Sequence, residues 1–273
     1  MHILIDIGNS TVVVAIADND GTIENTWRFK TRKEETVSFF RYELKQGLLK
    51  YGLQQSDIES VTISSVVPEV DDDISQAIID LTGIMPHFFS VDDVLKLMNI
   101  DVESPSQLGK DRLADALGAV SCYGVPAIII DFGTATTIGV VDESKTFQGG
   151  IIIPGVKTSL TALSQRASQL PSIHIERPRR LIGRNTLECM QSGILYGTSA
   201  MIDGLIEKLL PQFSVEPYLI ATGGMAKDIV PLCSHHIVYD KHLLLYNNNP
   251  PPTKDCPILF QSLQHFPGDL PQE

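Results

Sequence analysis

Two short phrases of the sequence combine an aspartate, a glycine and hydroxyl side chains in a pattern that suits phosphate chemistry. One phrase runs from Asp6 to Thr11 and the other from Asp131 to Thr136, each between two apolar, strand-like runs. Glycine lets backbone N–H groups approach a phosphate, and Asn, Ser or Thr side chains add donors. A carboxylate beside a phosphate needs a cation between them, so Asp6 and Asp131 are candidate ion ligands.

The two phrases resemble each other. They align as Asp-x-Gly-(Asn/Thr)-x-Thr, with Asp6 matching Asp131 and Thr11 matching Thr136. For a single loop, a hairpin turn that uses Asp and Gly only for its conformation is the better explanation. Two copies indicate a duplicated strand–loop–strand unit and therefore two related domains. Loops that face each other across a cleft favour nucleotide binding.

A third candidate is Gly109-Lys110-Asp111-Arg112, which opens a predicted helix. A carboxylate there could accept the proton of a substrate hydroxyl, and Arg112 could bind a carboxylate or a phosphate. Alternatively, Asp111 only caps the helix, a role worth about 0.5–2 kcal/mol. The residues alone leave both explanations open. Gly223-Gly224, between a predicted strand and a predicted helix, is a weaker signal.

The elements that must position these residues follow from hydrophobic periodicity, which predicts an α/β fold with mixed sheets. Predicted strands are His2–Ile7, Val12–Ala17, Thr22–Phe29, Val61–Val67, His87–Ser90, Ala127–Ile130, Ile138–Val141, Thr146–Ile153 and Tyr218–Ala221. Predicted helices are 34–51, Asp71–Leu81, Gly109–Ser121, Lys157–Ala167, Asn185–Leu210 and Met225–Leu232. We expect domains at 1–115 and 116–246, followed by an irregular Pro-rich tail at 247–273.

Composition excludes several classes of protein. The 273 residues include 33 acidic and 21 basic side chains, so the net charge is −12 and a nucleic-acid coat protein is not expected. No apolar stretch approaches the ~18–20 residues of a membrane span, and no signal peptide is evident, which predicts a cytoplasmic protein. The four cysteines lie far apart, as expected for reduced thiols and not for a disulfide framework or a zinc site.

Taken together, the motifs resemble type III pantothenate kinases. The motifs that match, in family order, are Asp6–Thr11, Gly109–Arg112, Asp131–Thr137, Gly149-Gly150, Pro154-Gly155, Gly183–Thr186, Met190–Gly193 and Ala221–Gly224. The individual loops are shared with the wider superfamily of acetate and sugar kinases, heat-shock chaperone ATPases and actin. Gly-x-Asp-Arg combined with Asp-Phe-Gly-Thr-Ala-Thr-Thr is much more specific.

This resemblance implies a fold and an activity. The fold would be two duplicated ribonuclease H-like (actin-like ATPase) domains, each a mixed five-stranded sheet flanked by helices. The activity would be ATP-dependent phosphorylation of the 4′-hydroxyl of pantothenate, the first step of coenzyme A synthesis. Homologues that have lost catalysis and act as regulators, and other small-molecule kinases of the superfamily, are the alternatives. Both loop aspartates and Asp111 are present, which argues against an idle homologue.

The resemblance also implies roles for individual residues. ATP would be bound by Asp6, Ile7, Gly8, Asn9, Ser10, Thr11, Val12, Val13 and Thr134, with Mg²⁺ near Asp6. Asp111 would be the general base, and Gly109, Lys110 and Arg112 would line the pantothenate site. Asp131 would bind the activating monovalent cation, K⁺ or NH₄⁺. Thr186 would contact pantothenate in the neighbouring subunit, which implies a homodimer.

Two local features qualify the resemblance. Family members often carry a tyrosine near the substrate seven residues before Gly109, where this chain has Val102. Charge is also uneven along the chain, because Lys157–Arg184 contains six cations and one acid, a local balance of +5. That stretch ends beside Thr186. We therefore expect the dimer interface to bring positive potential to an anionic substrate.

Overall fold

The chain forms two compact units, described here from a computed structural model that covers residues 1–19 and 21–245. Among the described residues, unit 1 contains 1–19, 21–98, 104–122 and 243–245, and unit 2 contains 99–103 and 123–242. The helix in which the expected boundary at residue 115 falls therefore belongs to unit 1 as a whole. The predicted tail at 247–273 lies outside the described residues.

Unit 1 is built on a five-stranded mixed sheet with the order β3-β2-β1-β4-β5. Its strands are β1 (His2–Ile7), β2 (Thr11–Ala17), β3 (Ile23–Lys30), β4 (Ser60–Ser65) and β5 (His87–Phe88). The first three strands form the predicted antiparallel meander, and β4 and β5 add in parallel. Parallel addition needs a helical crossover, and the long segment between β3 and β4 supplies one.

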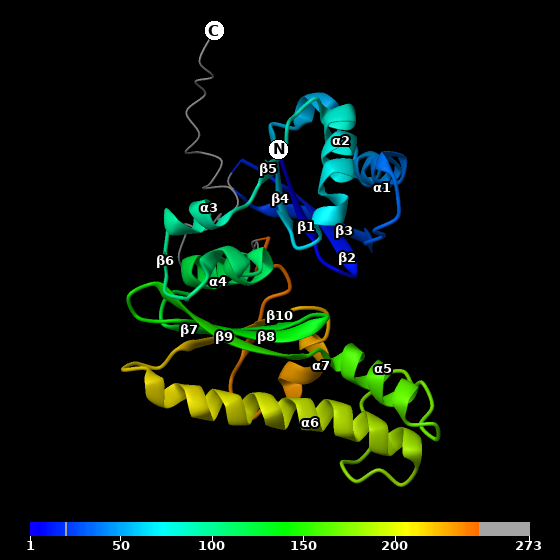
Figure 1. Cartoon of the computed structure of the whole chain (residues 1–273), viewed down its shortest axis with the longest axis vertical. Helices are drawn as coiled ribbons and strands as arrows, with labels where there is room; N and C mark the ends of the chain where they lie inside the picture. The colour runs from blue at the N-terminus through cyan, green and yellow to red at the C-terminus, as the bar shows by residue number, and fades with distance from the viewer. Residues whose placement is uncertain (20, 246–273) are drawn as a thin grey trace. The chain divides into compact units, whose positions relative to one another are not determined.

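Helices cover this sheet. They are α1 (Val37–Lys50), α2 (Asp71–Thr82), α3 (Val91–Leu95) and α4 (Lys110–Cys122). α1 and α2 lie side by side and bury their apolar faces against the strands, with Phe40 and Ile74 fully buried (Figure 1). Gly47 of α1 is needed for this packing, because a Cβ there would lie 2.0 Å from the Trp27 indole. α4 packs against α3 and β4.

Unit 2 repeats the arrangement around a sheet with the order β11-β10-β7-β8-β9-β6. Its strands are β6 (Asn99–Ile100), β7 (Ala127–Phe132), β8 (Ala135–Val141), β9 (Thr146–Pro154), β10 (Tyr218–Thr222) and β11 (Val238–Tyr239). Read in the opposite direction, the first five strands of this order (β9-β8-β7-β10-β11) match β3-β2-β1-β4-β5 of unit 1. The predicted count of five is therefore one too low for unit 2, because Asn99–Ile100 pairs with the outer edge of β9.

The helices of unit 2 are α5 (Val156–Arg166), α6 (Thr186–Leu209) and α7 (Ala226–Ile229). α6 runs along one face of the sheet, with α7 between helix and sheet (Figure 1). Ile202 and Ile206 of α6 are fully buried in the unit 2 core. The predicted helix Met225–Leu232 is shorter than expected, since its last residues, which include Pro231, form a 3₁₀ turn. Within the described part of the chain, no helix is both long and apolar enough to cross a bilayer.

Candidate functional site

The first aspartate–glycine loop joins β1 to β2 in unit 1. Asp6 is half-buried at the end of β1, opposite Val13 of β2 and Ser64 of β4. The Gly8 N–H donates to the Thr11 carbonyl (3.1 Å) and closes the loop. Thr31, just after β3, then clamps the loop from outside. Its Oγ1 donates to the Gly8 carbonyl (2.6 Å) and its N–H donates to the Ser10 carbonyl (3.2 Å).

The second loop, between β7 and β8 of unit 2, is held in the same way. Asp131 is half-buried at the end of β7 and pairs with Thr222 of β10. The Gly133 N–H donates to the Ala135 carbonyl (3.1 Å). The outer clamp comes from the residues after β9, since the Gly155 N–H (3.2 Å) and Thr158 Oγ1 (2.7 Å) both donate to the Thr134 carbonyl. The threonine clamps were not foreseen, although a threonine soon after the third strand of each meander was a visible signal.

The loops differ in length by one residue. Ile7 pairs with Val12, which leaves four residues in the first loop, whereas Phe132 pairs with Thr136, which leaves three in the second. The sequence alignment of Thr11 with Thr136 is therefore wrong by one position. Thr136 is buried in the sheet (1% exposed) where unit 1 has Val12 (0%).

Space around the Asp131 carboxylate is kept open by glycines. A Cβ on Gly223 would lie 2.2 Å from Asp131 Oδ1, and one on Gly133 would lie 3.0 Å from Oδ2. Gly223 also has a φ of +91°, which favours glycine. Because the two glycines form a cradle that any side chain would fill, the arrangement fits one carboxylate ligand of a small cation. Carboxylate oxygens are hard donors, which suit such ions.

The Gly109–Arg112 motif lies at the start of α4. Arg112 N–H donates to Asp111 Oδ1 (2.8 Å), and a Cβ on Gly109 would lie 2.4 Å from the same oxygen. The carboxylate therefore does satisfy a first-turn N–H, as the capping explanation requires. Its second oxygen, Oδ2, accepts no hydrogen bond from the residues that the structure describes, which leaves it able to receive one from a substrate hydroxyl. Burial lowers the pKa of Arg112, and the Asp111 charge partly opposes this shift.

Thr186 lies elsewhere, at the first residue of α6. It lines a groove of about 620 Å³ between α5 and α6. The apolar part of the groove, which sequence reasoning missed, consists of Leu160, Leu163, Leu170, Met190 and Ile194. Gly183 is needed where the preceding loop meets α6, because a Cβ there would lie 2.4 Å from the Cys189 nitrogen. The loop is fixed to α6 by Gln191, which donates to the His174 carbonyl (3.2 Å), and by Ser192, which donates to the Leu181 carbonyl.

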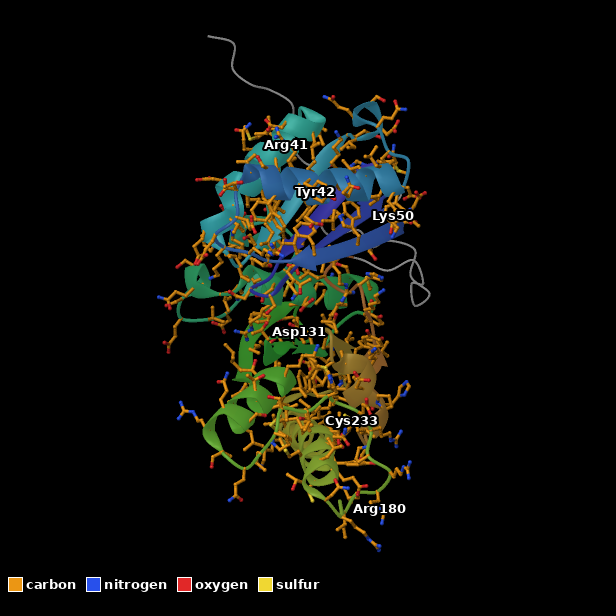
Figure 2. The ribbon with its side chains drawn as sticks, turned by 90° about the vertical axis from the view of Figure 1, so that its right-hand side faces the viewer. Arg41, Tyr42, Lys50, Asp131, Arg180 and Cys233 are labelled. Carbon is orange, nitrogen blue, oxygen red and sulfur yellow. The ribbon has the colours of Figure 1, made fainter. Side chains whose placement is uncertain are left out.

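The cations of Lys157–Arg184 are exposed, and Arg180 lies at the opposite end of unit 2 from Asp131 (Figure 2). The charge of Arg180 is therefore remote from the Asp131 loop of its own unit, whereas Lys157 precedes Thr158, whose hydroxyl donates to the Thr134 carbonyl in that loop. Asp6, its loop and the α4 motif belong to unit 1, where α4 packs on β4 and β4 pairs with β1. Asp131, Thr134 and Thr186 belong to unit 2. Among the described residues, no three acidic, histidine or cysteine side chains gather as a metal site.

This arrangement offers the parts that phosphoryl transfer needs. Each of the two glycine loops presents backbone groups beside a single carboxylate, and each carboxylate can hold a cation that neutralises phosphate charge. A separate carboxylate at a helix start can orient a hydroxyl group. Phosphoryl transfer relies mainly on such positioning and charge neutralisation.

Comparisons with known proteins agree with these features. A family model described as type III pantothenate kinase matches residues 2–208. A type III pantothenate kinase from Halalkalibacterium halodurans is 37% identical over 83% of this chain and 89% of its own length. One from Geobacillus kaustophilus is 35% identical over 91% and 98%. Among solved structures, a 2-hydroxyisocaproyl-CoA dehydratase activator from Clostridium difficile, with bound ADPNP, shares the fold (TM-score 0.52, 14% identity, 96% of this chain and 93% of that chain).

Proposed function

We propose that this chain, which belongs to the type III pantothenate kinase family, transfers the γ-phosphoryl group of ATP to the 4′-hydroxyl of pantothenate. The observation that carries this proposal is the Asp111 carboxylate, held between Gly109 and Arg112 with Oδ2 available to a substrate, in a chain with two clamped aspartate–glycine loops. The reaction is the first step of coenzyme A synthesis, and its need for ATP is consistent with action in the cytoplasm.

Asp111 is the proposed general base. An ordinary aspartate, with a pKa of about 3.9, is a weak base toward an alcohol. It can still orient the hydroxyl and accept its proton late, as the new P–O bond forms. Arg112, and Lys110 beside it, supply positive charge for the anionic substrates, while Gly109 leaves room for the carboxylate.

The loops are the proposed ATP and ion sites. In unit 1, the Ile7–Val13 backbone would wrap the phosphates of ATP, with Asp6 near Mg²⁺. In unit 2, Thr134 would contact ATP and Asp131 would bind K⁺ or NH₄⁺. The glycine cradle around the Asp131 carboxylate supports its role as an ion ligand. The ions offset carboxylate charge that would otherwise repel phosphate.

A homodimer is the proposed assembly, with Thr186 contacting pantothenate in the partner's site. A stripe of small residues on α6 supports this assembly, because Cys189, Gly193, Gly197 and Ala200 are exposed at helical spacing, the first two on the wall of the groove between α5 and α6. A Cβ at Gly193 or Gly197 would meet no atom within 4 Å, so a second backbone could approach closely there. The exposed cations before Thr186 would then raise the potential around the neighbouring site.

An acceptor panel tests the proposed function. ADP release is measured with Mg²⁺-ATP and pantothenate, glucose or acetate, each with and without KCl, and the products are identified by mass. Pantothenate-dependent ADP release and a product heavier by one phosphoryl group are expected. Turnover with only a sugar or acetate would contradict the substrate, and a folded chain that turns over ATP with none of them would indicate a regulator.

Subunit mixing tests the shared site. Asp111→Asn and Thr186→Ala are each expected to be nearly inactive as homodimers. A mixed dimer contains one site with neither substitution if Thr186 acts on the partner's Asp111 site, so co-refolding of the two variants should restore activity. Failure to recover activity in confirmed mixed dimers would place Thr186 in its own subunit's site or outside any site.

A further inference from the structure

Lys110 occupies an unfavourable position for a cation. It is the first residue of α4, and the positive end of a helix dipole favours acids there. None of the ion pairs among the described residues involves Lys110. The next residue but one, Arg112, brings a second positive charge to the same turn. Asp111, the acid between them, offsets one of these charges but forms no ion pair with Lys110. A lysine without an ion-pair partner at this end of a helix suggests a group kept ready for an anion.

An aromatic ring holds this lysine instead. Lys110 Nζ lies 5.9 Å from the centroid of the Phe88 ring, within the range of a cation–π contact. Unlike a carboxylate, a ring face attracts the ammonium group without cancelling its charge. The contact can therefore fix where the charge lies and leave it available to a ligand.

Phe88 itself is firmly placed. It is the last residue of β5, pairs with Ile63 of β4 and packs against the unit 1 core. On one side His87 Nε2 lies 3.0 Å from the buried Asp93 carboxylate, and on the other the Phe89 N–H donates to the Ile63 carbonyl (2.8 Å). Because α4 also packs on β4, ring and lysine are positioned by elements that share one strand.

We infer that Phe88 is a positioning residue, which holds the Lys110 ammonium beside the Asp111 base for an anionic oxygen of the bound substrates. That oxygen belongs either to the carboxylate of the acceptor or to the phosphoryl group in transfer. The inference rests on the proposed function and adds to it a residue outside the Gly109–Arg112 motif.

A double-mutant cycle tests the inference. Phe88→Leu keeps an apolar side chain in the core but removes the ring, and Lys110→Met removes the charge. In the enzyme that retains Lys110, Phe88→Leu should lower kcat/KM for pantothenate by about 2–5-fold, which corresponds to the free energy of an exposed cation–π contact. In the Lys110→Met background it should have no further effect. Equal losses in both backgrounds, or no loss in either, would overturn the inference.

Three further measurements sharpen this test. Pentafluorophenylalanine at position 88 preserves the shape of the ring and abolishes its attraction for cations, so it should reproduce Phe88→Leu even if that variant folds poorly. A neutral pantothenamide shows which anionic oxygen Lys110 contacts. If Phe88→Leu lowers kcat/KM only with pantothenate, the oxygen belongs to the pantothenate carboxylate, and if it lowers kcat/KM equally with both acceptors, the oxygen belongs to the phosphoryl group. Tyr51→Leu is the control, since Lys50 lies 5.2 Å from the Tyr51 ring in the same unit, and it should leave kcat/KM unchanged.

The outcome is distinguishable from a failure of the proposed function. A wild-type chain that is folded and binds ATP but shows no pantothenate-dependent ADP release would refute the kinase proposal itself. Normal wild-type turnover without coupling between positions 88 and 110 would refute only the role of Phe88.

Discussion

The hairpin β1–β2 of unit 1 and the hairpin β7–β8 of unit 2 have the same burial at every strand position. Even the register shift near the end of the second strand recurs, at Ile16/Ala17 and at Val140/Val141. The hairpins differ at the tip, where the first loop is one residue longer. Burial thus constrains the strands alike in both copies, while the solvent-facing loops have been free to diverge.

The strand beside each hairpin shows a second difference. At the last residue of β4, Ser65 Oγ donates to Asp71 Oδ1 (2.5 Å) and accepts from the Val67 N–H (3.1 Å), so this position stabilises the start of α2. After β10, the equivalent region has Gly223, which makes room for the Asp131 carboxylate. Only the second copy therefore encloses its aspartate in a glycine cradle, which suits a distinct role for Asp131.

The two aspartates provide the largest expected contrast. Asp6→Asn should lower kcat on the order of 100-fold, because charge neutralisation at the phosphates is a main part of catalysis. Asp131→Asn should lower kcat about 10-fold, which is the typical size of the effect that one bound ligand, here the monovalent cation, has on another. Titrations with MgCl₂ and KCl should show a changed Mg²⁺ requirement for the first variant and a changed K⁺ requirement for the second. The same ion requirement in both variants would remove the proposed division of roles.

Neighbouring glycines test the cradle. Gly223→Ala forces a side chain into a positive-φ position 2.2 Å from Asp131 Oδ1, which should cost about 1–3 kcal/mol of unfolding free energy and abolish stimulation by KCl. Gly224→Ala is the control, because its Cβ would meet nothing within 4 Å and should change stability by less than about 0.5 kcal/mol. Urea unfolding and KCl titration measure both. Equal behaviour of the two variants would contradict the cradle.

The threonine clamps should differ modestly between the units. Thr31→Val removes a part-buried hydrogen bond to the Gly8 carbonyl and should cost about 1 kcal/mol. Thr158→Val removes an exposed bond to the Thr134 carbonyl, where water can substitute, and should cost less. Thr161→Val is the control on the same helix, since its hydroxyl bonds only the Lys157 carbonyl. Urea unfolding and the KM for ATP check this, and a larger ATP effect from Thr161→Val would refute the clamps.

Each unit also contains a carboxylate that makes the protein sensitive to acid. Burial raises the pKa of Asp93, but hydrogen bonds from Lys96, Ser90 and His87 outweigh it and the net pKa is lowered. Burial likewise raises the pKa of Asp203, and bonds from Ser234 and His235 lower it overall.

Because the folded pKa is depressed, this stabilisation is complete above the ordinary value of about 3.9 and is lost as the pH falls from there through the folded pKa. Asp93→Asn and Asp203→Asn should each flatten the acid limb of stability measured by urea unfolding from pH 6 to pH 2. An unchanged acid limb in both variants would contradict this assignment.

Much of this architecture can be predicted from the sequence. Long periodic segments such as 186–209 give helices near the predicted bounds, and the duplicated phrase predicts the repeated sheet. The elements that were not predicted, β6, β11 and α3, contain two, two and five residues. These segments are too short to show the hydrophobic periodicity of a strand or a helix. The one-residue loop difference was missed because Thr11 and Thr136 are identical in type, and only strand pairing shows that Thr136 is buried.

Some residues of the candidate site could likewise be predicted from the sequence, and others could not. Motifs identify Asp6, Asp131 and Asp111 because their residue types carry the chemistry. Residues that act through contact were not predictable from the sequence, since Phe88, Thr31 and Thr158 become relevant only when the fold brings them to a partner. The role of Gly223 in accommodating Asp131 likewise depends on the pairing of β10 with β7.

The most direct test of the account compares wild type with Asp111→Asn under saturating Mg²⁺-ATP, KCl and pantothenate. ADP release is measured in parallel with ATP affinity by calorimetry, and Glu103→Gln, an exposed acid, serves as the charge-matched control. The account predicts pantothenate-dependent turnover in wild type and control, and its loss in Asp111→Asn with ATP affinity nearly unchanged. Near-normal turnover in Asp111→Asn would contradict the proposed mechanism.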